Sequence, residues 1–291
     1  MMPLPRRWLS SLLVRVGGDL ILFDCGEGTQ VAWRATGWSV RRLATICISH
    51  THSDHIAGLP GLFHTVANTG RTEPITVFGP VGLAAVVQGL RVIAPQLPFP
   101  VEVVELESGD RFPLPGGMQG ACAAGEHALP VLAYRIDLRR KRRFLADRAR
   151  SLGIPTSAWR TLQDGEPVNL GERTIEPDDV MGPARPGISV GYVTDTRPTP
   201  SIAELITGTT LLVCEGNYGD DADAEKAVRN QHMTFREAAT LARDAGVQQL
   251  WITHFSPGLD TPGLYTGNAQ EVFPEAVIAH DGLTVSLAFP D

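Results

Sequence analysis

The residues best able to do chemistry stand close together in the first fifth of the chain. His50, His52, Asp54 and His55 form an H-x-H-x-D-H cluster, which places four potential metal ligands within six residues. Imidazole nitrogens and a carboxylate oxygen suit zinc, and less selectively manganese or iron. The chain of 291 residues holds eight histidines, so three of them beside one aspartate argue against a set of ordinary loop histidines. The cluster therefore predicts a metal site.

The spacing of the cluster favours two metal ions over one. Alternate residues of an extended segment point to the same side, which groups His50 with His52. Asp54 and His55 then turn away, so a single ion is hard to satisfy with all four side chains. Two adjacent ions held by neutral imidazoles are the natural solution, and they need more ligands. The candidates elsewhere in the chain are His127, Asp195 and His254.

Most of these candidates lie where a buried strand is expected to end. Four apolar runs finish in a polar residue: 44–50, 188–195, 209–215 and 248–254. Ligand sites of layered α/β proteins gather at strand ends, because loops converge there on a rigid sheet. Helical spacing is found at 55–69, 81–93 and 233–246. This alternation predicts an α/β fold.

Further strands are expected in the first half of the chain. Residues 11–16 and 20–24 flank Gly17-Gly18 and predict a hairpin. The segments expected to form strands of a second sheet are 101–106, 111–115 and 131–136.

Composition and charge limit the class of protein. With 43% hydrophobic and 20% charged residues, the chain is typical of a soluble globular protein with a sizeable core. It has no apolar run of 18 residues and no signal-peptide cleavage pattern, so we expect no membrane partner. The four cysteines form no C-x-x-C pair, which fits a reducing, cytoplasmic location.

The positive charge is concentrated in one segment. The net charge of −7 excludes a uniformly basic surface, yet residues 139–150 contain seven Arg or Lys and one Asp. Residues 137–187 also interrupt the strand pattern, being basic first and then rich in Gly and Pro. We interpret them as an inserted arm of a single domain that spans 1–291. A solvated charge run is the alternative interpretation.

The chain resembles the metallo-β-lactamase superfamily through its H-x-H-x-D-H motif and the order of the later His, Asp and His. Finer stretches resemble the ribonuclease Z branch: LFDCGEGTQ (22–30), SHTHSDHIAGLPGL (49–62), HALPVLAYR (127–135), TDTRPT (194–199), HMTFREAA (232–239) and THFSP (253–257). The resemblance covers nearly the whole chain. It implies a metallo-β-lactamase-type four-layer αβ/βα sandwich with the metals at one edge of the two sheets and a short inserted basic arm.

The resemblance also implies the roles of the site residues. It implies two Zn²⁺ ions per chain, with Mn²⁺ or another divalent ion as the alternative. One ion would be held by His50, His52 and His127, the other by Asp54, His55 and His254, with Asp195 bridging both. His232 would donate a proton to the leaving oxygen and Glu215 would orient it. Asp54 would also accept a proton from the attacking water.

The implied activity is that of a zinc-dependent endoribonuclease. It would remove the 3′ trailer from precursor tRNA by attack of a metal-activated water and leave a 3′-hydroxyl, and a homodimer is implied as well. The arm would grip RNA through its phosphates. The candidate substrate-binding residues are Arg7, Arg139, Arg140, Lys141, Arg142 and Arg143.

Two other classes of function compete with this interpretation. A phosphodiesterase or other hydrolase of the superfamily, acting on a small substrate, would need no basic arm. A non-catalytic RNA-binding module would need no open metal site, which the full set of ligand candidates argues against.

The chain departs from the common family pattern in three places. Residues 214–218 read Cys-Glu-Gly-Asn-Tyr where many members have His-Glu-Ala-Thr-Phe. In the arm, residues 154–159 read Ile-Pro-Thr-Ser-Ala-Trp where many members carry a Gly-Pro element, so the arm is expected to be of a different subtype. In the N-terminal loop, Pro5 and Trp8 replace the Lys and Asn of a P-x-K-x-R-N pattern, while Arg7 is kept. The chain also begins inside this loop, without the strand that precedes it in relatives, and our hypothesis is a start codon assigned too late.

Overall fold

The computed structural model describes residues 4, 7–171 and 173–290, so Pro5 and the first three residues lie outside it. The chain divides into two compact units. The first comprises Met1–Asp137 and Ser189–Ser286, and the second comprises Leu138–Ile188 and Leu287–Asp291. The predicted insertion, 137–187, therefore covers nearly the same residues as the main part of the second unit.

The first unit contains a five-stranded sheet in the order β1-β2-β3-β4-β5. Its strands are β1 (Leu12–Val16), β2 (Asp19–Phe23), β3 (Leu43–Cys47), β4 (Ile75–Pro80) and β5 (Val101–Leu106). The first two strands form the predicted hairpin, in which Gly17 supplies the left-handed φ of 58° that the tight turn requires. The other pairs are parallel.

The prediction that residues 101–106 belong to the second sheet is wrong. These residues form β5, which pairs in parallel with β4. Helix α4 (Leu83–Leu90) connects the two strands, and such a strand–helix–strand crossover returns the chain to the same sheet beside the strand it left. A strand's own sequence does not reveal this choice of partner.

A seven-stranded sheet in the order β14-β13-β12-β11-β8-β7-β6 completes the first unit's framework. Its strands are β6 (Arg111–Leu114), β7 (Met118–Ala124), β8 (Leu132–Arg140), β11 (Arg185–Val193), β12 (Leu211–Glu215), β13 (Leu250–Thr253) and β14 (Val277–Ile278). β6, β7 and β8 pair antiparallel, whereas β11 to β14 are parallel. The four predicted apolar runs thus correspond to β3, β11, β12 and β13.

The helices differ from their predicted lengths at the ends. The predicted helix 55–69 is divided at Ala57 and Gly58 into α2 (Ser53–Ile56) and α3 (Leu59–Ala67). The predicted helix 81–93 comprises α4 and a 3-10 turn at Arg91–Ile93. The remaining helices of the first unit are α1 (Thr29–Ala35), α7 (Pro200–Leu205), α8 (Ala224–Asn230), α9 (Phe235–Asp244) and α10 (Thr266–Gln270).

Both ends of helix α9 lie close to the predicted bounds, 233 and 246, because residues near each end cap the helix. The Thr234 hydroxyl accepts from the Glu237 backbone N–H, and the Glu237 carboxylate accepts from the Thr234 N–H, which is a capping box. At the other end Gly246 has a φ of 66° and its N–H donates to the Arg243 carbonyl. The N-cap of α9 thus stands two residues after His232.

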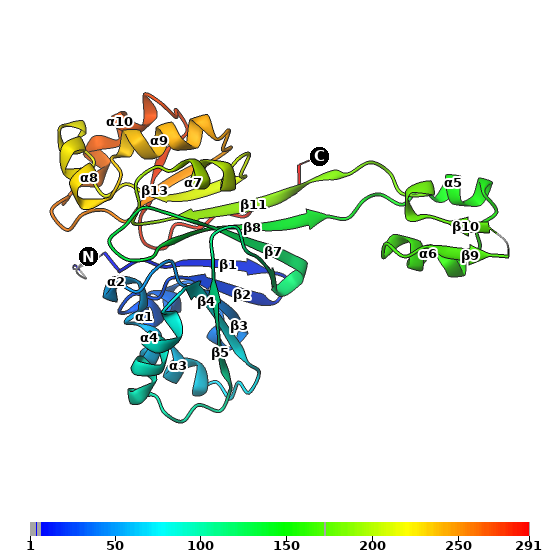
Figure 1. The fold of residues 1–291 in the computed structure, drawn as a ribbon, viewed down its shortest axis with the longest axis horizontal. Helices are drawn as coiled ribbons and strands as arrows, with labels where there is room; N and C mark the ends of the chain where they lie inside the picture. Colours follow the sequence, from blue (N-terminus) through cyan, green and yellow to red (C-terminus); the bar gives the residue numbers. More distant parts are fainter. Residues whose placement is uncertain (1–3, 5–6, 172, 291) are drawn as a thin grey trace. The chain divides into compact units, whose positions relative to one another are not determined.

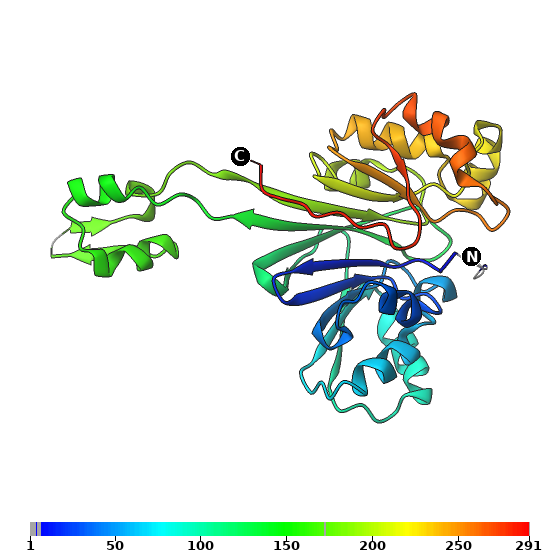
Figure 2. The same ribbon diagram turned by 180° about the vertical axis from the view of Figure 1, so that it is seen from behind.

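The two sheets face each other through aromatic side chains, and helices cover their outer faces. The Phe23 ring lies 5.4 Å from that of Tyr192 and 5.9 Å from that of Tyr134, and the Tyr134 hydroxyl donates to the Ile48 carbonyl at 2.7 Å. Figures 1 and 2 show α1, α3 and α4 outside the first sheet and α7, α9 and α10 outside the second. The predicted four-layer αβ/βα sandwich is confirmed.

The second unit has a small core of its own. It consists of α5 (Ala146–Ser151), α6 (Thr156–Gln163) and the antiparallel pair β9 (Val168–Leu170) and β10 (Arg173–Ile175). The buried residues of this core are Ala149, Ile154, Ala158, Leu162, Ile175 and Val180. The ends of β8 and β11 lead into this unit and out of it.

None of the helices in the described part of the chain has the length and apolar character that crossing a membrane requires.

Candidate metal centre

The seven predicted metal ligands lie together at one edge of the sandwich. His50 follows β3, Asp195 follows β11 and His254 follows β13, so parallel strands deliver three of them from their carboxyl ends. His52 precedes α2, which carries Asp54 and His55 in its single turn, and His127 lies in the loop between β7 and β8. Their side-chain N and O atoms form two groups that could each hold a metal ion.

The first group consists of His50, His52, His127 and Asp195. His50 Nε2 and His127 Nε2 lie 2.9 and 3.3 Å from His52 Nδ1, and they lie 3.6 and 3.8 Å from Asp195 Oδ2. Ligands about 2.0–2.1 Å from a tetrahedral zinc ion stand roughly 3.3 Å apart. The observed separations match that spacing, so the donor set fits a zinc-sized cation.

The second group consists of Asp54, His55 and His254, with the other oxygen of Asp195. His55 Nε2 lies 3.1 Å from His254 Nε2 and 3.4 Å from Asp54 Oδ2. Asp195 Oδ1 lies 3.0 Å from His254 Nε2 and 3.5 Å from His55 Nε2. Each carboxylate oxygen of Asp195 therefore faces a different group, which is the geometry of a bridging ligand.

The charges around His55 favour a cation in this cluster. Burial by itself lowers the pKa of His55, but the Asp195 and Asp24 carboxylates raise it well above its ordinary value. Burial and the neighbouring His55 lower the pKa of His50 to about 2, so His50 stays neutral. A divalent metal ion bound here would supply the positive charge that these buried carboxylates favour, in place of the proton on His55.

Asp24, which orients the His55 ring, was not among the site residues predicted from the sequence. Asp24 directly follows β2 and is fully buried, and its Oδ2 lies 2.7 Å from His55 Nδ1. The same carboxylate accepts hydrogen bonds from the Ser49 N–H at 2.7 Å, the Ser49 hydroxyl at 2.8 Å and the Tyr192 hydroxyl at 2.8 Å. With Nδ1 bound to Asp24, Nε2 of His55 is left to face the metal ligands. A buried aspartate at the end of an apolar strand is a signal that could have identified it.

His232 and Glu215, the predicted catalytic pair, lie beside the cluster. Glu215 Oε2 is 3.0 Å from His232 Nδ1, and the His232 ring lies 5.8 Å from His254 and 5.4 Å from His127. Glu215 is fully buried at the end of β12 and also accepts from the Thr196 and Met233 N–H groups. Burial lowers the pKa of His232, but the Glu215 and Asp195 carboxylates together raise it, and the net shift is upward.

One side of the centre is open to solvent. The candidate ligands His52 and His127 and the nearby His232 are half-buried, whereas the remaining five candidate ligands are buried. A substrate and the water that attacks it can therefore approach from the side on which these three imidazoles lie.

The predicted substrate-binding arginines differ in how firmly they are held. Arg7 donates to the carbonyls of Ser256 and Leu259 at 3.0 and 2.9 Å, just after the ligand His254 in the chain. In the second unit, Arg142 donates to the carbonyls of Gly182 and Met181.

The rest of the basic segment is more open. Arg140 donates to the Pro290 carbonyl and lies 5.5 Å from the Phe289 ring. Arg139, Lys141 and Arg143 are exposed.

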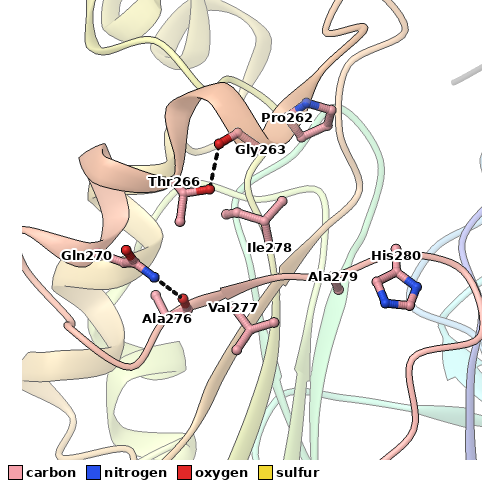
Figure 3. A pocket seen from close by; sticks show the side chains of 9 residues that line it. All are labelled: Pro262, Gly263, Thr266, Gln270, Ala276, Val277, Ile278, Ala279 and His280. Atoms are coloured by element: carbon pink, nitrogen blue, oxygen red, sulfur yellow. Dashed lines mark hydrogen bonds between the residues drawn. The ribbon is translucent and has the colours of Figure 1, made fainter.

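The first unit also has a cavity of about 450 Å³ beside β14 and α10 (Figure 3). Its polar groups are already paired, since the Thr266 hydroxyl donates to the Gly263 carbonyl and the Gln270 amide donates to the Ala276 carbonyl. None of the candidate metal ligands lines it.

Two protein-family models match parts of the chain. Residues 161–255 match the model of the β-lactamase superfamily domain, and residues 5–85 match that of the anti-Pycsar protein Apyc1. Individual relatives match nearly the whole chain. Ribonuclease Z of Lachnospira eligens is 44% identical over the whole chain and 96% of its own length. Ribonuclease Z of Clostridioides difficile is 40% identical over 99% of this chain and 96% of its own.

Solved structures share the fold at lower sequence identity. The short form of human tRNase Z has a TM-score of 0.71 and 22% identity, and the match covers 99% of this chain and 96% of that one. The metallo-β-lactamase fold protein YhfI from Bacillus subtilis has a TM-score of 0.68 and 19% identity, over 97% and 92% of the two chains.

Proposed function

The chain belongs to the ribonuclease Z family of metal-dependent endoribonucleases, and from this premise we propose that it removes the 3′ trailer from precursor tRNA and leaves a 3′-hydroxyl. The observation that carries the proposal is the pair of ligand groups that share Asp195, in a chain whose full-length relatives are ribonucleases. The solved fold relative named tRNase Z supports the class of RNA.

We propose two Zn²⁺ ions per chain, one in each ligand group. When bound, the ions would supply a water of lowered pKa and positive charge near the scissile phosphate. The ligands His50, His52 and His127 would hold one ion and Asp54, His55 and His254 the other. Ligand atoms around a tetrahedral zinc ion stand about 3.3 Å from one another. The separations between donor atoms within each group are close to this value, which supports the assignment.

The remaining chemistry falls to the chain's own side chains. We propose that His232 donates a proton to the leaving oxygen, and that Glu215, whose carboxylate raises the pKa of His232, keeps it protonated. We propose that Asp54, at the buried end of the cluster, accepts a proton from the attacking water. His232 is half-buried on the open side of the centre, where a leaving group can reach it.

Recognition of the RNA is proposed to involve the basic segment and the N-terminal loop. Arg139, Lys141 and Arg143 are exposed and can contact phosphates, with Arg140 and Arg142 beside them in the chain. Arg7 is proposed to act at the metal centre's edge, because it is tied to the loop that follows His254.

We further propose that the chain works as a homodimer in the cytoplasm. Its four cysteines are all buried and unpaired, which supports a reducing compartment. Sedimentation analysis of the purified chain tests the dimer, and a monomer at micromolar concentration would contradict it.

The test of the function is cleavage of a 3′-extended precursor tRNA by the zinc-loaded chain, followed by mapping of the new end. We expect one cut after the unpaired nucleotide that follows the acceptor stem, with a 3′-hydroxyl on the tRNA. Hydrolysis of a small phosphodiester without cleavage of the precursor would instead establish the small-substrate hydrolase.

A further inference from the structure

Ser49, which directly precedes the candidate ligand His50, contacts both that ligand and the buried Asp24. Its hydroxyl oxygen lies 2.8 Å from Asp24 Oδ2 and 3.0 Å from His50 Nδ1. Its backbone N–H donates to the other carboxylate oxygen, Asp24 Oδ1, at 2.7 Å. His55 Nδ1 lies 2.7 Å from Asp24 Oδ2 and 3.5 Å from the Ser49 hydroxyl oxygen. Asp24 therefore contacts His55 directly and is connected to His50 through Ser49.

The position of the single hydroxyl proton of Ser49 follows from these contacts. A carboxylate can only accept hydrogen bonds, and Asp24 Oδ2 also accepts from the Tyr192 hydroxyl at 2.8 Å. The Ser49 hydroxyl must therefore donate its one proton to Asp24, and its oxygen is left to accept from His50. The proton of a neutral His50 imidazole then lies on Nδ1, and Nε2 carries none.

This tautomer of His50 is the one that metal binding requires. His50 Nε2 faces the other donors of the first ligand group, 2.9 Å from His52 Nδ1 and 3.6 Å from Asp195 Oδ2. An imidazole nitrogen binds a metal ion only when it carries no proton. In the second ligand group, His55 donates from Nδ1 to Asp24 and so leaves its own Nε2 unprotonated in the same way.

Water cannot replace a partner in this series of hydrogen bonds. The four residues that form it have no exposed surface: Asp24, Ser49, His50 and His55. A buried N–H that loses its acceptor is left unsatisfied, because no solvent reaches it. The tautomer of His50 therefore depends on the Ser49 hydroxyl.

We propose that Ser49 is a positioning residue, which accepts the His50 Nδ1 proton and links this ligand to Asp24. One buried carboxylate then orients a histidine in each ligand group, His55 directly and His50 through the Ser49 hydroxyl. The inference rests on the proposed metal centre, and it adds a connection between the two metal sites.

The zinc affinity of the full chain, measured by competition with a chromogenic chelator, tests the role of Ser49. Ser49→Ala removes the acceptor of His50 but leaves the contact between Asp24 and His55. One of the two zinc ions should therefore bind about 10–100-fold more weakly, which is the usual effect of losing such a partner, and the other should bind as in the wild type.

Asp24→Asn tests the shared carboxylate without a change of volume. The Ser49 backbone N–H keeps the amide oxygen at the position of Oδ1, which puts the amide nitrogen, a donor, in the place of Oδ2. His55 Nδ1 must then accept, and the Ser49 hydroxyl must turn its proton toward His50. Both histidines would carry their proton on Nε2, so both zinc ions should bind more weakly.

Ser189→Ala is the matched control. Ser189 is a buried serine of β11, and its hydroxyl oxygen accepts from the Thr210 N–H at 3.1 Å. This variant loses a buried hydroxyl of the same unit and should bind both zinc ions as the wild type does.

Each contrary result has a distinct meaning. Wild-type affinity for both ions in Ser49→Ala would overturn the inference. An equal loss of both ions in that variant would also overturn it, because a merely structural role predicts that result. Weakening of one ion alone in Asp24→Asn would overturn the shared carboxylate. A wild-type chain that binds no zinc would instead overturn the proposed metal centre, and the inference with it.

A measurement on the wild-type chain covers the case in which Ser49→Ala does not fold. The ¹H–¹⁵N spectrum of the metal-free chain should show the His50 proton on Nδ1, and a proton on Nε2 would overturn the proposal.

Discussion

Three residues around the metal centre hold a backbone conformation that is rare for any residue except glycine. Asp24, Asp195 and His254 have φ values of 53°, 47° and 57°, and each directly follows or nearly follows a strand. Such conformations cost about 1–3 kcal/mol each and persist only where the surroundings impose them. Here the left-handed residue turns the chain at the end of its strand, and the side chain enters the cluster.

The role of His232 predicts a loss of rate without a loss of metal. His232→Ala removes a proton donor but none of the ligands proposed for either ion, so the chemical rate should fall by about 10²–10⁴-fold. Zinc content, measured by elemental analysis, should stay at the wild-type value. Loss of zinc in this variant would show that His232 is a ligand and not a donor.

The Glu215–His232 pair predicts a change in the pH profile. A proton donor works only while protonated, so activity should fall as the pH rises through the pKa of His232. Glu215 raises that pKa. Glu215→Gln should therefore move the alkaline limb of kcat to lower pH, while the exposed Glu204→Gln leaves it in place. An unmoved limb in Glu215→Gln would contradict the pairing.

The cluster of candidate ligands could be predicted from the sequence, whereas the residue that orients His55 carries only a weak signal. His50, His52 and His55 stand in a contiguous pattern that is rare by chance. Asp24 is a single polar residue at the end of the apolar run 20–24, a feature that it shares with ordinary turn residues. Its role follows from a contact with His55, which lies 31 residues further along the chain.

At the scale of elements, the junction between α2 and α3 fits closely against the loop that follows β2. The Gly58 N–H donates to the Cys25 carbonyl at 2.8 Å, and the Cys25 N–H donates to the His55 carbonyl at 2.7 Å. A Cβ on Gly58 would lie 2.1 Å from the Gly26 carbonyl oxygen, which is backbone and cannot move independently. This close approach explains why the predicted helix 55–69 is divided here.

A substitution at this junction should disturb both stability and the metal centre. Gly58→Ala must push the loop after β2 away from α2, so the free energy of unfolding should fall by about 1–3 kcal/mol, and zinc affinity should fall with it. Gly89→Ala in α4 is the control, because a Cβ there meets no atom within 4 Å. It should raise stability by about 0.5–1 kcal/mol. Equal urea midpoints for the two variants would contradict this account.

Whether a segment forms a helix or a strand could be predicted where its caps and its hydrophobic pattern agree. Which sheet a strand joins could not be predicted. The capping box of α9 and the apolar runs of β3, β12 and β13 indicate the elements and their approximate bounds. The sequence of strand β5 does not indicate which sheet the strand joins, because its pairing with β4 is determined by the crossover connection through α4. Long-range pairing of this kind depends on chain connectivity and not on the residues of the strand.

At the scale of the whole molecule, the two units have separate chemical tasks in the proposed function. All the candidate ligands belong to the first unit, and the basic segment, residues 139–150, belongs to the second. Arg142 is tied to carbonyls within its own unit, so it also stabilises the unit that would carry the RNA contacts.

This division predicts that RNA binding and hydrolysis can be separated. Replacing the exposed Arg139, Lys141 and Arg143 with alanine should weaken precursor tRNA binding and reduce its salt slope by about one for each phosphate that these side chains neutralise. Hydrolysis of a small chromogenic phosphodiester should not change. The control replaces three exposed arginines of the first unit: Arg34, Arg111 and Arg243. An equal fall of both activities in the first variant would argue against a separate RNA-binding surface.

The proposed function depends most directly on two metal ions that share Asp195 as a ligand. Native mass spectrometry of the zinc-loaded chain measures the number of ions per chain. We expect two ions in the wild type, and loss of bound zinc together with activity in Asp195→Ala. A wild-type chain that holds fewer than two ions, or an Asp195→Ala chain that still holds both, would contradict it.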